Sequence, residues 1–214
     1  MNNAIIIDVR DIVYNSEEKL PNYEYRKNLL ENLIEEYNER IDKLQNKNNE
    51  TKIEKISLNN MPPAFTYNNA IFISNLKVLL LMYRLSGYCE VEDEDGLMEE
   101  VLVHEKVHVS QWYRDNNMLE HLLDKNYSLE CEAEAYAHQI VFNTNKNGKN
   151  IEYIHDYLRT IYPEISDEEL KDKTLESTIR GVATTLDASP LYRFNGVDKI
   201  YDKIKYHVDK IVVR

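Results

Sequence analysis

The sequence predicts a mainly helical α+β protein. Its 214 residues include only five glycines and five prolines, and so few turn-forming residues favour helices over a strand-rich sandwich. Apolar residues recur at helical spacing over long stretches, whereas strand-like patterns are short and few. Hydrophobic residues make up 43% of the chain and charged residues 30%, which is the composition of a globular protein with a sizeable core.

The expected elements follow from these patterns in chain order. Strands are predicted over residues 4–14, 52–58 and 70–74, where apolar residues either alternate with polar ones or form short runs. Helices are predicted over residues 22–45, 76–85, 96–115, 128–143, 150–161, 166–187 and 197–213. The helix at 166–187 opens with a capping box, Ser166-Asp167-Glu168-Glu169.

Charge and hydropathy exclude several classes of protein. The formal net charge of −12 disfavours binding to nucleic acid, whose phosphates would repel an acidic surface. The apolar run from Ala4 to Ile7 is too short for a signal peptide, and the run from Val78 to Tyr83 is far shorter than a membrane span. Two cysteines do not make a disulfide framework. We therefore expect a cytoplasmic protein, or one exported without an N-terminal signal, that binds neither nucleic acid nor membrane.

One segment carries the spacing of a metal site, His104-Glu105-Lys106-Val107-His108. Residues four apart lie on one face of a helix, so His104 and His108 could occupy two corners of a zinc tetrahedron. Glu105 lies beside the same face and could act as a general base toward a metal-bound water. With only three fixed positions, such a motif also arises by chance on solvated helix faces, so its meaning depends on a third ligand.

Candidate third ligands lie on the next predicted helix. A metzincin would need a histidine at position 114, which is Arg114, and a peptide deformylase would need a cysteine in a setting unlike that of Cys89. A gluzincin would need a downstream glutamate, and Glu130, Glu132 and Glu134 each stand three residues before an alanine. Glu130 and Glu134 share a helix face while Glu132 points nearly opposite, so spacing alone leaves all three open.

The runs VLVHEKVHVSQW and NYSLECEAEAYAHQ resemble small bacterial and phage-associated zincin domains, among them the metallopeptidase-like core domain of extracellular contractile injection systems. The matching residues are Gln111, Trp112, Glu132, Glu134, Ala135 and Tyr136. The resemblance implies Glu132 as the third ligand, followed in preference by Glu134 and then Glu130. Tyr136 stands where gluzincins in general have an acidic residue, which often orients a ligand histidine.

The resemblance covers about residues 66–142, the expected metal-binding core of a single zincin-like domain over 1–214. Residues 1–60 would add an N-terminal strand and helix, and residues 150–214 would add C-terminal helices. A small sheet that includes Ala70 to Ser74 would lie over the active-site helix, and an extended peptide would pair with its edge.

The expected function is hydrolysis of peptide bonds in a peptide or protein substrate. Zn²⁺ held by His104, His108 and Glu132 would activate water, with Glu105 as general base. Tyr192 and Arg193 are candidates for stabilising the oxyanion. The alternatives are a catalytically silent zinc-binding module of a phage or injection-system assembly, and a helical protein without metal. The sequence leaves the oligomeric state open.

Overall fold

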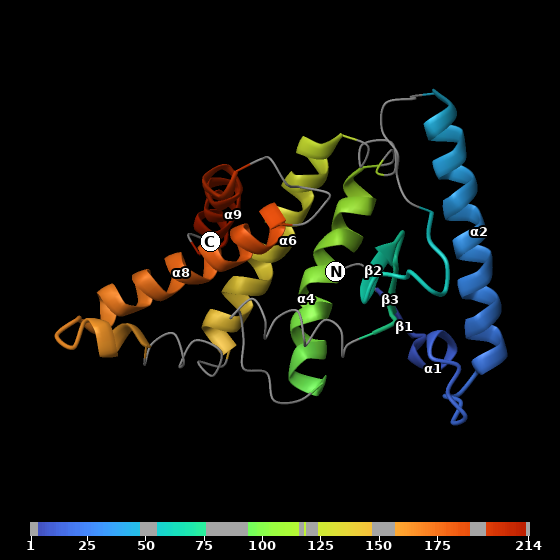
Figure 1. Ribbon diagram of the computed structural model, residues 1–214, viewed down its shortest axis with the longest axis horizontal. Coiled ribbons are helices and arrows are strands. Elements are labelled where there is room, and N and C mark those ends of the chain that lie inside the picture. The colour runs from blue at the N-terminus through green and yellow to red at the C-terminus, as the bar shows by residue number, and fades with distance from the viewer. Residues whose placement is uncertain are drawn as a thin grey trace.

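In the part of the chain that it describes, the computed structural model is mainly helical with a small three-stranded sheet (Figure 1), in agreement with the predicted mainly helical α+β class. It describes residues 4–47, 55–75, 94–115, 118, 124–146, 157–188 and 196–212. The strands are β1 (Ile5–Asp8), β2 (Ala64–Tyr67) and β3 (Ala70–Ile73). The helices are α1 (Arg10–Val13), α2 (Tyr23–Lys47), α4 (Glu94–Arg114), α6 (Lys125–Lys146), α8 (Asp167–Ala188) and α9 (Val197–Val212). Residues 157–161 form a further helical turn.

The central strand of the sheet is β3. It pairs with β1 in parallel, Ile7 opposite Phe72, and with β2 in antiparallel, Phe65 opposite Phe72. The turn between β2 and β3 places Asn68 at φ 55°, a left-handed conformation that asparagine tolerates better than most residues. Both edges of β3 are therefore occupied, and β2 is the edge strand on its side of the described sheet.

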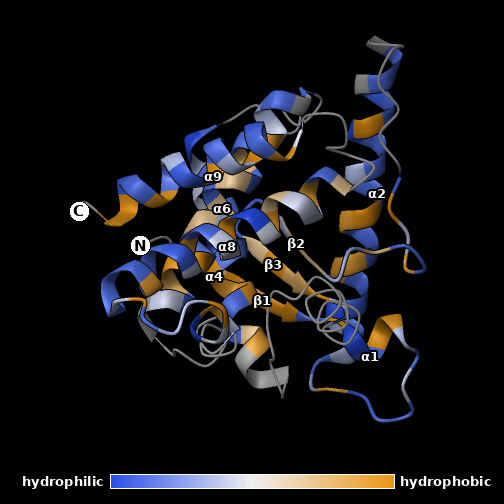
Figure 2. Ribbon diagram, turned by 60° about the vertical axis from the view of Figure 1, so that its left-hand side comes forward, coloured by the Kyte–Doolittle hydropathy of each residue, from blue (hydrophilic) through white to orange (hydrophobic). Residues whose placement is uncertain are grey.

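The sheet separates two apolar clusters, because successive side chains of a strand point to opposite faces. Ile71 and Ile73 of β3 pack in one cluster with residues of α4 and α6. Phe72 packs in the other cluster with Leu30 and Leu33 of α2. Helix α4 thus lies on one face of the sheet and α2 on the other (Figure 1). Figure 2 shows the hydrophobic colouring of the strands between them.

Helix α6 connects the sheet half of the protein to the C-terminal helices. It packs against α4, α8 and α9, and α8 also packs against α9. Ala133 and Ala137 of α6 are fully buried in the cluster shared with α4, and such small side chains allow two helices to approach closely. Among the described residues, no helix combines the length and hydropathy needed to cross a membrane.

Two of the three predicted strands are wrong in extent. Strand β1 ends at Asp8 rather than residue 14, because Asp8 Oδ1 accepts a hydrogen bond from the Arg10 N–H at 3.1 Å and the chain turns into α1. Residues 55–58 form no strand, since the N–H and C=O of Ile56 bond to the side-chain amide of Asn38 at 3.0 and 2.8 Å. Residues 52–54 of that predicted strand lie outside the described residues.

The remaining predictions of secondary structure agree with the fold. The predicted strand at 70–74 is β3, and five predicted helices are α2, α4, α6, α8 and α9, with ends within three residues of those expected. In the capping box, Ser166 Oγ accepts from the Glu169 N–H at 3.3 Å and donates to Glu169 Oε2 at 3.0 Å. The predicted helix at 76–85 and most of the one at 150–161 fall outside the described residues.

Candidate metal centre

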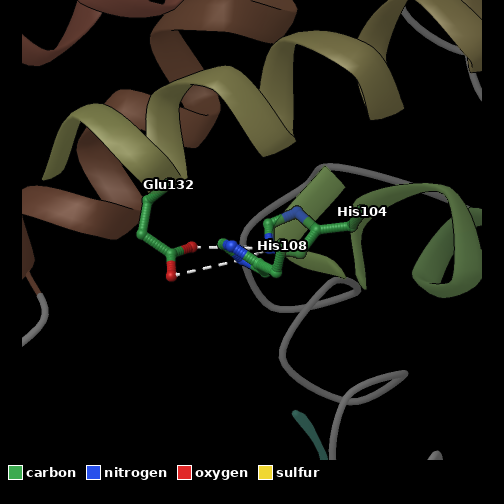
Figure 3. A group of neighbouring side chains, drawn as sticks. All are labelled: His104, His108 and Glu132. Atoms are coloured by element: carbon green, nitrogen blue, oxygen red, sulfur yellow. Dashed lines mark hydrogen bonds and ion pairs between the residues drawn. The ribbon is translucent and has the colours of Figure 1, made fainter. Parts of the chain in front are cut away.

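Helices α4 and α6 bring His104, His108 and Glu132 together (Figure 3). The Nε2 atoms of the two histidines lie 3.1 Å apart. Glu132 Oε2 lies 3.4 Å from His104 Nε2, and Glu132 Oε1 lies 3.6 Å from His108 Nε2. One potential ligand atom can be chosen from each of the three residues so that all three atoms lie within 4.8 Å of one another.

These distances suit a tetrahedral metal ion. Zinc bonds of about 2.1 Å to nitrogen and oxygen place neighbouring ligand atoms roughly 3.4 Å apart in a tetrahedron. The two histidine nitrogens lie 3.1 Å apart, and each lies 3.4 or 3.6 Å from a different oxygen of Glu132, so these separations are close to that value. Two imidazoles and one carboxylate also form a donor set found in catalytic zinc sites, where the fourth position stays open. The residues present therefore fit a zinc ion.

The charges at the site favour a cation. Burial alone would lower the pKa of His104, but the hydrogen bond and charge of Glu132 and the charge of Glu105 outweigh it, so the pKa is raised. Burial alone would raise the pKa of Glu132, but the charge of His108 and the bond from His104 outweigh it, so that pKa is lowered. Glu132 is therefore ionised at neutral pH and attracts positive charge.

The two other candidate glutamates face different partners. Glu130 accepts hydrogen bonds from Lys203 and, at 2.8 Å, from His207, so its carboxylate is turned toward α9. Glu134 forms an ion pair with Arg114 at 2.5 Å, at the C-terminal end of α4. Of the three carboxylates that spacing left open, the one brought to both histidines is that of Glu132.

Glu105 lies next to the candidate ligands and contacts Thr66 of β2. The Thr66 hydroxyl is within hydrogen-bonding distance of Glu105 Oε2, at 2.8 Å, and of the Glu105 main-chain oxygen, at 3.0 Å. Only 6% of Glu105 is exposed to solvent, so its carboxylate is fixed in direction rather than free on the helix surface. The proximity of Glu105 contributes to the raised pKa of His104.

A cavity of about 360 Å³ opens over these groups. The lining includes His104, Glu105, His108 and Glu132. The remaining lining residues are mostly apolar or aromatic: Pro62, Pro63, Ala64, Phe65, Thr66, Val101, Trp112, Met118 and Tyr136. The cavity therefore brings the candidate ligands, the candidate base and residues of strand β2 to one surface.

Gln111 contacts the Nδ1 side of the His108 ring, whereas Nε2 of the same ring faces Glu132. Its Oε1 lies 2.7 Å from His108 Nδ1, and its Nε2 donates to the Cys131 main-chain oxygen and to Glu134 Oε2, each at 2.9 Å. Tyr136 packs its ring edge-on to His104, with ring centroids 4.5 Å apart. Tyr136 thus contacts a candidate ligand histidine through its ring.

Comparisons with protein-family models, with curated proteins and with solved structures found no match to this chain. The assignment of this site therefore depends on its geometry and its sequence pattern. Tyr192 and Arg193, the candidates for oxyanion stabilisation, lie outside the described residues.

The contact of Thr66 with Glu105 was not foreseen from the sequence, since it joins residues 39 positions apart and has no local pattern. The contact of Gln111 with His108 could be predicted from the sequence, because residues three apart on a helix are neighbours.

Proposed function

We propose that this protein is a zinc-dependent peptidase of the gluzincin kind. The observation that carries the proposal is the convergence of His104, His108 and Glu132, from two helices, beside a buried Glu105 on a shared cavity. A zinc ion held by the three ligands would supply Lewis acidity, which polarises a carbonyl and makes water more acidic.

In this proposal Glu105 moves the proton. Its carboxylate accepts a proton from the attacking water and then delivers it to the nitrogen of the leaving amine. The Thr66 hydroxyl donates a hydrogen bond to Glu105 Oε2, whereas Glu105 Oε1 receives none from Thr66. The rest of the cavity lining is largely apolar, which would lower the local dielectric and strengthen electrostatic interactions around the reacting bond.

In this proposal the edge of the sheet that receives a peptide is β2, because β3 is paired on both sides. Tyr67 and Ala70 flank a two-residue turn and form a hydrogen-bonded pair. Because hydrogen-bonded and non-hydrogen-bonded pairs alternate along antiparallel strands, the N–H and C=O groups of Ala64 and Thr66 point away from β3. Both residues line the cavity. An extended peptide would pair with this edge and lie across the metal ligands.

Zinc content and peptide hydrolysis together test the proposal. Protein purified without added metal and without a histidine tag should contain about one zinc per chain, as expected for one three-ligand site. Glu132→Ala should lose most of this zinc. The matched control is Glu130→Ala, on the same helix, which should keep it because Glu130 faces Lys203 and His207.

Glu105→Gln then separates catalysis from metal binding. The variant should keep zinc and lose hydrolysis of a mixed peptide library, since an amide cannot accept the proton. Zinc retained by the wild type with no hydrolysis of any peptide would favour the catalytically silent module. Absence of zinc, even with excess metal, would overturn the metal site itself.

A further inference from the structure

Gln111 contacts a candidate ligand histidine, the helix that carries the third candidate ligand, and a second carboxylate. Its side chain is 2% exposed, so its amide must be satisfied by protein groups rather than by bulk water. The geometry of these contacts determines which way the amide faces.

The main-chain oxygen of Cys131 can only accept a hydrogen bond, and so can the ionised carboxylate of Glu134. The Gln111 atom that faces both at 2.9 Å must therefore be the nitrogen. Arg114 holds Glu134 in place through both carboxylate oxygens. With its two N–H groups used in this way, the Gln111 amide presents its oxygen to the ring of His108.

That oxygen, Gln111 Oε1, is an acceptor 2.7 Å from His108 Nδ1. The contact is a hydrogen bond only if Nδ1 carries the hydrogen. In the neutral ring, Nε2 is then bare, and it lies 3.1 Å from His104 Nε2 and 3.6 Å from Glu132 Oε1. A bare Nε2 is the form that binds a metal ion.

We infer that Gln111 is a positioning residue that fixes the Nδ1–H tautomer of His108 and thereby prepares its Nε2 as a ligand. The Cys131 carbonyl and the Arg114–Glu134 pair set the orientation of the Gln111 amide. The inference rests on the proposed function in taking His108 as a zinc ligand, but the tautomer itself can be measured without metal.

The first test is NMR of the histidine ring nitrogens in the metal-free full-length protein. At about pH 9, well above the ordinary histidine pKa of about 6.5, a histidine ring is neutral. The chemical shift of a ring nitrogen that carries hydrogen then differs from that of a bare ring nitrogen. Wild-type His108 should carry hydrogen on Nδ1, and Gln111→Met should move it to Nε2. His207, whose Nε2 faces Glu130, serves as an internal reference that should not change.

A matched pair of variants separates positioning from packing. Gln111→Met and Gln111→Glu both lose the N–H groups that bond Cys131 and Glu134, but only Gln111→Glu keeps an acceptor for His108. Gln111→Met should weaken zinc binding about 10-fold to 100-fold, and Gln111→Glu should weaken it less. Equal losses, or a wild-type His108 with hydrogen on Nε2, would overturn the inference. A wild type that shows the Nδ1–H tautomer but never binds zinc would instead overturn the proposed function.

Discussion

The hydroxyl of Thr66, on strand β2, lies 2.8 Å from the Glu105 carboxylate, on helix α4. The same hydroxyl lies 3.0 Å from the Glu105 main-chain oxygen. The strand that would receive a peptide therefore also holds the candidate general base, and two elements far apart in the sequence form one functional unit.

Removing this hydroxyl should slow catalysis without removing the metal. We expect Thr66→Val to lower kcat about tenfold, which is the effect of one lost hydrogen bond of about 1.4 kcal/mol in the transition state. Zinc content should not change, because the Thr66 bonds go to Glu105 and not to a ligand. Thr66→Ser keeps the hydroxyl and should keep kcat. A parallel loss of zinc in Thr66→Val would contradict the positioning role.

Chelation of the metal should lower the melting temperature. A metal that binds the native state stabilises it by mass action, by about 4 kcal/mol when the free metal is a thousand times its dissociation constant. Thermal unfolding of the wild type with and without chelator measures this effect. Glu132→Ala, which lacks one ligand, should show little difference between the two conditions. An unchanged wild-type melting temperature would support a helical protein without metal.

Enlarging the contact between α4 and α6 should disturb the site from a distance. Ala133 is fully buried in the cluster that these helices share and adjoins Glu132 in sequence. We expect Ala133→Leu to destabilise the protein by about 1–3 kcal/mol through overpacking and to weaken zinc binding, since α6 must shift. Urea unfolding and zinc titration measure the two effects. Ala188→Leu, at an exposed position of α8, is the matched control and should change neither.

The ion pair of Asp11 and Arg26 should make stability depend on acid pH. The two side chains form bonds of 2.7 and 2.8 Å and are largely buried. Chiefly through the hydrogen bonds from Arg26, the pKa of Asp11 is lowered from 3.8 to about 2 in the folded protein. A lowered carboxyl pKa stabilises the fold above the unfolded pKa, and this contribution is lost as pH falls from about 4 toward 2.

Urea unfolding at a series of pH values tests this linkage. Asp11→Asn should cost about 2 kcal/mol near neutral pH, and the difference from the wild type should shrink as the pH falls below about 4. Asp198→Asn is the control, because its exposed pair with Arg180 contributes little. A difference between Asp11→Asn and the wild type that stays constant down to pH near 2 would contradict the lowered pKa.

The helices were predictable because their signals are local. Apolar spacing located five of them, and the Ser166–Glu169 capping box located the start of α8. The error at residues 55–58 has a different origin. The alternating pattern there suggested a strand, but the side chain of Asn38 on α2 supplies the hydrogen bonds that a neighbouring strand would have supplied.

The candidate site was predictable in part. Helical spacing placed His104 and His108 on one face, but the choice among three glutamates depended on how α6 packs, which spacing does not encode. Residues that act across elements, such as Thr66, leave no periodic signal. Strand β2 escaped prediction because it is short and follows Pro62-Pro63, and its pairing depends on the turn at Asn68.

The division of the three candidate ligands between α4 and α6 has a consequence for assembly of the protein. If these residues bind zinc, a chain in which α4 alone had formed would offer two imidazoles without the Glu132 carboxylate, so it would bind the ion weakly. Tight binding would then require that α6 has docked on α4. In refolding, the moment at which a zinc indicator loses its metal to the protein would therefore time the docking of these two helices.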